Sequence, residues 1–504
     1  MGIFLSDSEL DELESAEQAF ESPVPTQLIS NGEFNPLPQT EQQKQVEGRI
    51  KELADELGAK QGLNRRQFLR TSSGMAAAFL AMNEVFGPLF NVSEAEAATP
   101  ERAEEMRAAL KGQFIFDVQT HFVHDGYKQE GILGLAAFAK ENWNPALEAV
   151  KDIAIYKFEN YVRQVFLNSD TAVAVLSGAP FDDKSWEFLT NDAIRASVDM
   201  INSVAGAGTR RMLGHAVVTP GQDGWMEKVD YAIDKLRPDS WKMYTIGDPL
   251  SAGTKYPWRL DDEKLVYPFY EKVLKAGINT ICIHKGLMPA DYEKSWKDVW
   301  KYNTVWDVGK AAKDWPDLNF VIYHGGLRAF LEAPEASLAK FEESGEIEWA
   351  SDLAHIPEEY GVSNVYAEMG TSFGNSCTAN PRFAAALLGT WIKGMGVDHV
   401  VWGTDSVLYG SPQWQIEALR RLEIPEDMQK KHGFQPLGSA NGFVKNQIFG
   451  LNSARIYGLQ LRADNSPFSE DNFAQIKREY ELAGGLDNLR DNAAYGWIAK
   501  NEVA

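Results

Sequence analysis

The sequence predicts an α/β protein whose main domain is a (β/α)8 TIM barrel, with an N-terminal signal extension and a C-terminal helical tail. Eight short runs of apolar and β-branched residues recur in order between Phe114 and Trp402, with helical patterns between them. Regular alternation of strand and helix predicts a parallel sheet, here closed into a barrel. The 504 residues can hold a barrel of about 250 residues with insertions and extensions.

The predicted strands are short runs, most of which are followed directly by a polar or charged residue. They lie near Phe114–Val118, Thr171–Leu176, Met212–Val218, Ser240–Tyr244, Asn279–Ile283, Asn319–Tyr323, Asn364–Ala367 and His399–Trp402. The clearest helix between them runs from Asp261 to Ala276. Apolar residues recur there at helical spacing between Val266 and Val273, and Gly277 marks the end.

Residues 64–97 have the pattern of a twin-arginine export signal. The run Asn64–Arg70 contains two arginines, a phenylalanine and a leucine at the expected offsets, and an Ala-rich apolar stretch, Thr71–Phe90, follows. Ala95–Ala97 then forms an A-x-A cleavage pattern. The alternative is an ordinary amphipathic helix that begins with two arginines. The signal predicts that the export machinery moves the folded protein to the periplasm or the outside.

The other segments flank this signal and the barrel. Residues 1–63 form an acidic leader, expected to be flexible, with a helical run near Glu41–Leu57. Residues 98–113 are a linker or helix, the barrel spans 114–459, and residues 460–504 form a helical tail expected on the barrel exterior.

Charge and cysteine content exclude some classes of function. The formal net charge of −23 argues against nucleic-acid binding, which requires a basic face. The two cysteines, Cys282 and Cys377, are too few for a disulfide scaffold or a thiolate zinc site. We expect a small-molecule substrate. The sequence is compatible with either a monomer or a homo-oligomer.

The first predicted strand ends in polar side chains. Asp117, Gln119 and His121 have the same parity, so they lie on one face of the strand. Burying such a face is costly unless something polar or metallic lies against it. We therefore expect this strand to form the floor of an active site at the carboxyl end of the barrel.

Four other strands add polar residues at the same end. His284 ends strand five, His324 follows strand six, Glu368 follows strand seven, and Asp405 follows strand eight. Strand four carries Lys242. These ends converge on one cavity in a barrel. The alternatives are buried core histidines, a helix N-cap for Asp405, and a structural ion pair between Lys242 and Glu368.

From these positions the chain resembles the metal-dependent amidohydrolase superfamily, in the branch called amidohydrolase family 2 (amidohydrolase-related), over roughly Phe114 to Leu459. The matching segments run from Leu260 to His284, from Trp315 to Gly326, from Asn364 to Ala367, from Gly396 to Asp405 and from Ile448 to Leu459. Each segment is weak alone, but together and in order they are specific.

The resemblance implies one divalent metal ion, zinc first and manganese as the alternative. His121, His284 and Asp405 match the family's ligand positions, and Asp405 would also carry protons between water and leaving group. Gln119 stands where the family has histidine, and its neutral amide oxygen is a weaker ligand for zinc. The site is therefore expected to bind metal less tightly, to prefer a harder ion, or to lack metal.

The remaining residues receive supporting roles. By resemblance, His324 would orient or polarise the substrate. Asp117 would hold a ligand or a neighbouring strand, and His124, three residues after His121, is a candidate replacement for the missing ligand. Lys242 would bind a substrate carboxylate or pair with Glu368.

The resemblance implies a metal-dependent hydrolase of an amide, ester or lactone. It fits a non-oxidative decarboxylase of an aromatic acid equally well, because both reactions use the same ligands. Aromatic residues in the loops after the strands, such as Trp258, Trp296, Trp300 and Trp414, would wall an apolar pocket or only fasten the loops. The third hypothesis is that Gln119 marks a metal-independent hydrolase or an inactive binding protein.

Overall fold

The barrel consists of eight parallel strands that are hydrogen-bonded in sequence order, from β1 to β8. The computed structural model describes residues 22–29, 37–127, 156–182, 187–206, 208–248, 253–288, 292–328, 334–461 and 466–485. The strands are β1 (Phe116–Thr120), β2 (Val173–Leu176), β3 (Met212–Val217), β4 (Ser240–Tyr244), β5 (Thr280–His284), β6 (Asn319–Tyr323), β7 (Val365–Glu368) and β8 (Val400–Val401). The predicted fold class is confirmed.

Closure comes from hydrogen bonds between the first and last strands. The backbone N–H of Val118 donates to Trp402 at 3.0 Å, and that of Asp405 donates to Gln119 at 2.9 Å. A parallel bridge between Thr120 and Ser406 extends this contact. The segment that follows β8 is therefore held against β1, which brings the polar ends of both strands together.

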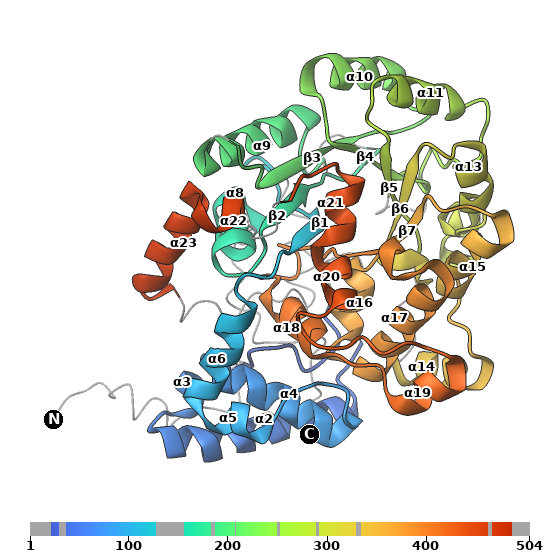
Figure 1. Ribbon diagram of the computed structural model, residues 1–504. Helices are drawn as coiled ribbons and strands as arrows, with labels where there is room; N and C mark the ends of the chain where they lie inside the picture. The colour runs from blue at the N-terminus through green and yellow to red at the C-terminus, as the bar shows by residue number, and fades with distance from the viewer. Residues whose placement is uncertain are drawn as a thin grey trace, which may run out of the picture.

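Helices surround the strands (Figure 1). In chain order they include α8 (Phe158–Val162), α9 (Asn191–Ala205), α10 (Trp225–Tyr231), α11 (Tyr267–Lys275), α13 (Val308–Asp314), α14 (Pro334–Ser344), α15 (Ala350–Tyr360), α16 (Gly370–Ser376), α17 (Pro381–Met395), α18 (Gln413–Arg421), α19 (Glu426–His432), α20 (Phe443–Asn446) and α21 (Asn452–Ile456). The helix predicted from Asp261 begins later, at Tyr267. Pro268 explains the difference, because proline lacks an N–H and is tolerated only in the first turn.

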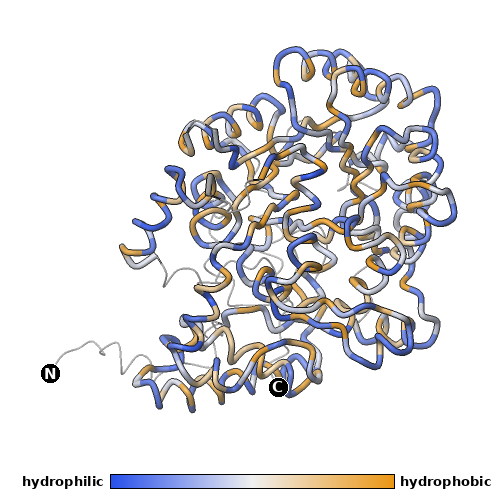
Figure 2. The backbone as a smooth tube through the Cα atoms, viewed as in Figure 1, coloured by the Kyte–Doolittle hydropathy of each residue, from blue (hydrophilic) through white to orange (hydrophobic). Residues whose placement is uncertain are grey.

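The strands bury both faces, and residue parity decides which face each side chain joins. Ile281 and Ile283 of β5 point outward into the core shared with the helices. Cys282 points inward and joins Val321 and Tyr323 in the barrel interior. Figure 2 shows the resulting concentration of hydrophobic residues along the central strands. His284 has the parity of Cys282, so it continues the interior row toward the carboxyl end.

The N-terminal residues form a helical group at one end of the barrel, coloured blue in Figure 1. It consists of α2 (Glu41–Gln61), α3 (Arg65–Leu69), α4 (Ser72–Phe86), α5 (Glu94–Ala98) and α6 (Pro100–Leu110). The segment predicted as an acidic leader thus contains a regular helix, α2, beside α4, the helix of the export-signal pattern. In the part of the chain that the structure describes, no helix is both long and apolar enough to cross a membrane.

The C-terminal residues form two short helices, α22 (Ser466–Glu470) and α23 (Asn472–Leu482), on the barrel exterior beside α9 (Figure 1). Arg211 joins the tail to β3 through a buried ion pair with Asp471 at 2.7 Å. The Phe473 ring lies 5.4 Å from that of Phe166.

Candidate active site

Asp405 lies at the centre of the polar cluster at the carboxyl ends of the strands. Its Oδ1 accepts a hydrogen bond from Gln119 Nε2 at 3.0 Å and lies 3.1 Å from His121 Nε2. Its Oδ2 accepts from the Thr371 hydroxyl at 2.7 Å. Asp405 also has a left-handed backbone with φ of 59°. A non-glycine residue in that region costs about 1–3 kcal/mol and is common at functional sites.

These neighbours determine the charge of Asp405. Burial alone would raise the pKa of its carboxyl group. The hydrogen bond and positive charge of His121, together with the Thr371 hydrogen bond, outweigh burial and hold the pKa below its usual range. Asp405 is therefore a carboxylate throughout the ordinary pH range.

The hydrogen bonds of His121 imply a positive charge next to Asp405. His121 Nδ1 lies 2.9 Å from the Ser177 carbonyl oxygen, which can only accept, so Nδ1 carries a proton. Nε2 then faces the Asp405 carboxylate at 3.1 Å. Two lone pairs would repel at this distance. Either a second proton on His121 or a cation must therefore lie between the two side chains.

A chain of hydrogen bonds fixes the protons on the other two histidines. The backbone N–H of Thr371 donates to His324 Nδ1 at 3.2 Å, so the proton of neutral His324 lies on Nε2. That Nε2 lies 3.1 Å from His284 Nδ1 and donates to it. The proton of His284 is consequently on Nε2. A protonated nitrogen has no lone pair for a metal, so in this state His284 is a hydrogen-bond donor.

Burial keeps both histidines neutral. It lowers the pKa of His324 to about 3, against the opposing charge of Asp405. It lowers the pKa of His284 well below its usual value, and the neighbouring His324 and Lys242 lower it further. The Tyr244 ring stacks on His284 at 4.4 Å, with 13° between the planes. His324 uses both ring nitrogens inside the protein and orients His284.

Glu368 and Lys242 lie deeper in the barrel. Glu368 Oε2 accepts a hydrogen bond from the backbone N–H of His324 at 3.0 Å. Burial raises the pKa of Glu368 to about 8, although the His324 bond and the Lys242 charge oppose the rise. Lys242 Nζ lies 3.4 Å from the centre of the Tyr323 ring, a cation–π contact. Glu368 therefore supports the backbone of His324 as a largely protonated acid at neutral pH.

Asp117 joins β1 to the segment after β8. Its Oδ1 accepts from the backbone N–H groups of Gln119 and Thr404, each at 3.1 Å, and its Oδ2 accepts from the Thr404 hydroxyl. Burial raises its pKa to about 7, and the bonds to Thr404 and Gln119 limit the rise. These contacts place Gln119 and Asp405 on one rigid frame.

His124 lies in the loop after β1, and its ring contacts Tyr127 edge-on at 5.9 Å. The contacts of the Asp405 carboxylate described above come from Gln119, His121 and Thr371. Two site residues, Thr371 and Tyr409, were not predicted from the sequence. The Tyr409 hydroxyl donates to that of Thr371 at 3.2 Å. The polar run after Glu368 was the available signal for Thr371.

Two glycines allow these side chains to approach the backbone. A Cβ atom at Gly403 would lie 1.8 Å from Glu368 Oε1. Gly370, with φ of 33°, has Gln119 Oε1 at 2.6 Å from the place of its missing Cβ. Any larger residue at either position would displace the side chains around Asp405.

The donor atoms around Asp405 fit a metal ion only in part. The 3.1 Å between His121 Nε2 and Asp405 Oδ1 suits two ligands of one ion. Gln119 Oε1 beside them is buried without a hydrogen-bond partner. Among the described residues, however, no three His, Cys, Asp or Glu side chains come together to hold a metal. An ion would rest on one imidazole, one carboxylate and an amide oxygen, which suits manganese better than zinc.

Aromatic side chains lie next to the polar cluster. Phe188 contacts His121 edge-on at 6.2 Å. It also packs against an apolar cluster that contains Phe181 and Tyr244, with Trp296 at the edge. Trp258 and Trp414 are buried and donate to the carbonyls of Tyr244 and Tyr409, so they fasten loops. These aromatic rings form the apolar surroundings of His121 and His284.

Comparison with known proteins identifies relatives of this barrel. A protein-family model described as Amidohydrolase matches residues 116–459. No curated protein matches the chain. Among solved structures, an uncharacterised TIM-barrel protein from Bordetella bronchiseptica is 14% identical, with a TM-score of 0.43 over 68% of this chain and 98% of that one.

Two further structures have similar statistics. A probable 2-pyrone-4,6-dicarboxylic acid hydrolase from Acinetobacter baumannii is 12% identical, with a TM-score of 0.38 over 68% of this chain and 99% of that one. A 5-carboxyvanillate decarboxylase from Novosphingobium aromaticivorans, complexed with manganese, is 14% identical, with a TM-score of 0.37 over 69% and 97%.

Proposed function

Because the chain belongs to the amidohydrolase family, we propose that it is a hydrolase that cleaves an amide, ester or lactone bond of a small molecule. The environment of Asp405 carries this proposal. An ionised, buried carboxylate with a left-handed backbone is held by three side chains at the carboxyl end of a barrel, where barrel enzymes place their chemistry.

Asp405 is the proton carrier in this proposal. Its carboxylate would take a proton from the attacking water and later give it to the leaving group. Thr371 and Gln119 would hold the carboxylate in one orientation during both transfers. His121, Asp405 and Gln119 would hold a divalent ion. When bound, such an ion supplies Lewis acidity, which makes water a better nucleophile near neutral pH.

His284 would stabilise the negative charge that develops on the substrate oxygen. Its Nε2 would carry the proton for this hydrogen bond, because His324 donates to its Nδ1. His324 thus acts through His284 as a positioning residue, and Glu368 would hold the backbone of His324. Neutral imidazoles suit this task, because they donate a hydrogen bond without giving up a proton.

Decarboxylation of an aromatic acid is the second candidate, and the aromatic surroundings of His121 and His284 favour it. The Tyr244 ring stacked on His284 and the Phe188 ring against His121 suit a planar ring bound between them. In that reaction the Asp405 carboxylate would take a proton from water and pass it to the ring carbon as carbon dioxide leaves.

One experiment separates the two reactions. The purified chain is incubated in ¹⁸O-labelled water with a panel of esters, lactones, amides and hydroxybenzoic acids, and products are analysed by mass spectrometry. Hydrolysis incorporates label into the acid product, whereas decarboxylation yields an aromatic product that has lost its carboxyl group and has gained no label. Asp405→Asn should abolish either activity. Asp398→Asn is the matched control, because half-exposed Asp398 lies before β8, at the opposite end of that strand. Equal activity in both variants would refute the role of Asp405.

A further inference from the structure

The apolar helix of the export-signal pattern is a core element of the folded protein. Seven residues of α4 between Met75 and Met82 are at most 4% exposed. They belong to the same apolar core as the outer faces of β4 to β8 and the barrel helices α17 and α18. A helix that is buried on all sides needs neighbours all round, which α2, α3, α5 and α6 supply together with α18.

The predicted cleavage point lies inside this buried group. Ala97 is fully buried in α5, and Glu96 is 6% exposed. The Glu96 carboxylate accepts a hydrogen bond from Arg421 Nη2 of the barrel helix α18 at 2.6 Å. Removing one partner of a buried ion pair leaves the other with less compensation.

Backbone pairing adds a second connection to α18. The N–H of Asn91 donates to the Arg421 carbonyl, and the N–H of Glu423 donates to the Leu89 carbonyl, both at 2.7 Å. These bonds flank an antiparallel bridge between Phe90 and Leu422. The Phe90 ring in turn lies 4.7 Å from Phe79 of α4. The barrel thus pairs with residues on the N-terminal side of the cleavage point.

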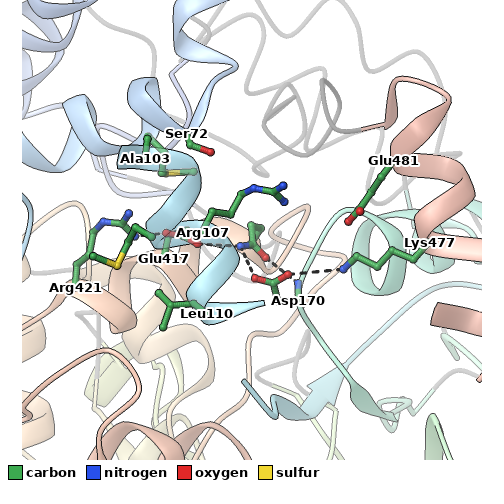
Figure 3. Close-up of a pocket in the computed structure, with 12 residues that line it drawn as sticks. Ser72, Ala103, Arg107, Leu110, Asp170, Glu417, Arg421, Lys477 and Glu481 are labelled. Atoms are coloured by element: carbon green, nitrogen blue, oxygen red, sulfur yellow. Dashed lines mark hydrogen bonds and ion pairs between the residues drawn. The ribbon is translucent and has the colours of Figure 1, made fainter. Parts of the chain in front are cut away.

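Two adjacent arginines of α18 bind residues on opposite sides of the predicted cleavage point. Arg420 donates to the Leu110 carbonyl at 3.0 Å, downstream of it, whereas Arg421 holds Glu96, upstream of it. Figure 3 shows the pocket at this seam, whose lining includes Ser72 of α4, Arg107 of α6 and Arg421 of α18. Cleavage would remove part of its wall.

The residues of the signal motif itself are also used by the fold. Phe68 and Leu69 are buried, and Arg65 forms two hydrogen bonds with Asp55 of α2. Gly74 allows α4 to lie against α3, because a Cβ there would be 2.3 Å from the Phe68 carbonyl oxygen. An export signal that is discarded needs no such fit.

We propose that residues 41–98 are a permanent structural part of the enzyme and are not removed after Ala97. The proposal is independent of the reaction that the barrel catalyses. It predicts that the protein keeps the twin-arginine motif in its final form, docked on α18 and hidden from a receptor that must contact Phe68 and Leu69.

The first test is the intact mass of the full chain, purified from the cell fraction in which it accumulates. The expected species begins upstream of residue 41. A purified protein that begins at Ala98 would overturn the proposal. This measurement does not depend on any variant folding correctly.

The second test compares two glycine-to-alanine variants of the full chain. Gly74→Ala should lower the melting temperature and speed tryptic cleavage between Arg65 and Arg70, because the methyl group meets backbone that cannot rotate away. Gly48→Ala, in α2, is the matched control, since nothing lies within 4 Å of its Cβ position. Both variants leave the export pattern intact. Identical behaviour of the two would show that α4 is not docked.

Discussion

Replacing Glu368 by glutamine should change how stability depends on pH. Glutamine has nearly the same shape and can still accept the hydrogen bond from the His324 N–H, so the contact at 3.0 Å is kept. It cannot ionise, however. The variant therefore isolates the cost of placing a negative charge at this buried position.

The pKa of Glu368 sets the size and direction of the effect. Burial raises it from 4.5 to about 8 in the folded protein. Below pH 4.5 both the folded and the unfolded protein hold the proton. Between pH 4.5 and about 8 only the folded protein holds it, so its free energy of unfolding falls as pH rises. The difference amounts to about 4–5 kcal/mol over the whole window.

Urea unfolding of the wild type and Glu368→Gln between pH 5 and pH 9 measures this directly. The variant should gain about 4 kcal/mol relative to the wild type across that range, with no further gain above it. Glu343→Gln, at an exposed position on α14, is the control. Its free energy of unfolding should depend on pH in the same way as that of the wild type. Parallel curves for Glu368→Gln as well would refute the argument that burial keeps Glu368 protonated.

Three other perturbations test the surroundings of Asp405. Thr371→Val removes a hydrogen bond to its carboxylate, worth about 1.5–3 kcal/mol, and should lower kcat/KM about 10- to 100-fold, whereas Thr371→Ser should retain most activity. Gly403→Ala places a methyl group 1.8 Å from Glu368 Oε1 and should lower the melting temperature more than any exposed glycine substitution. Elemental analysis should find about one divalent ion per chain, lost in Asp405→Asn; a chain that takes up no metal would favour the metal-independent hypothesis based on Gln119.

The barrel was predictable because its signal is local. The apolar runs that form β5 and β6 each lead directly to a histidine. The observed bounds of both strands lie within one residue of the predicted bounds. Strand β8 is shorter than predicted, since Trp402 already bonds to the backbone of β1 and of Ile448. Helix α11 begins later than the apolar spacing predicts, because Pro268 is compatible only with the first turn of a helix.

The details of the site depend on contacts that no local pattern contains. The sequence predicts His284, His324 and Asp405 at the carboxyl ends of three strands, but the proton positions follow from Thr371, which belongs to helix α16. The role of α4 was ambiguous for another reason. Small apolar residues serve equally in an export signal and in a helix buried on every side, and only its neighbours distinguish the two.

The contacts of Arg421 determine where the chain can be truncated for expression. The family model begins at residue 116, which invites a design that starts there. Such a design would discard Glu96 and Phe90, and leave Leu422 and the guanidinium of Arg421 without the surfaces that bury them. Sequence families record the stretch that relatives share, whereas cooperative folding follows the stretch that is packed together. We expect the shortest stable version of this enzyme to begin before α2.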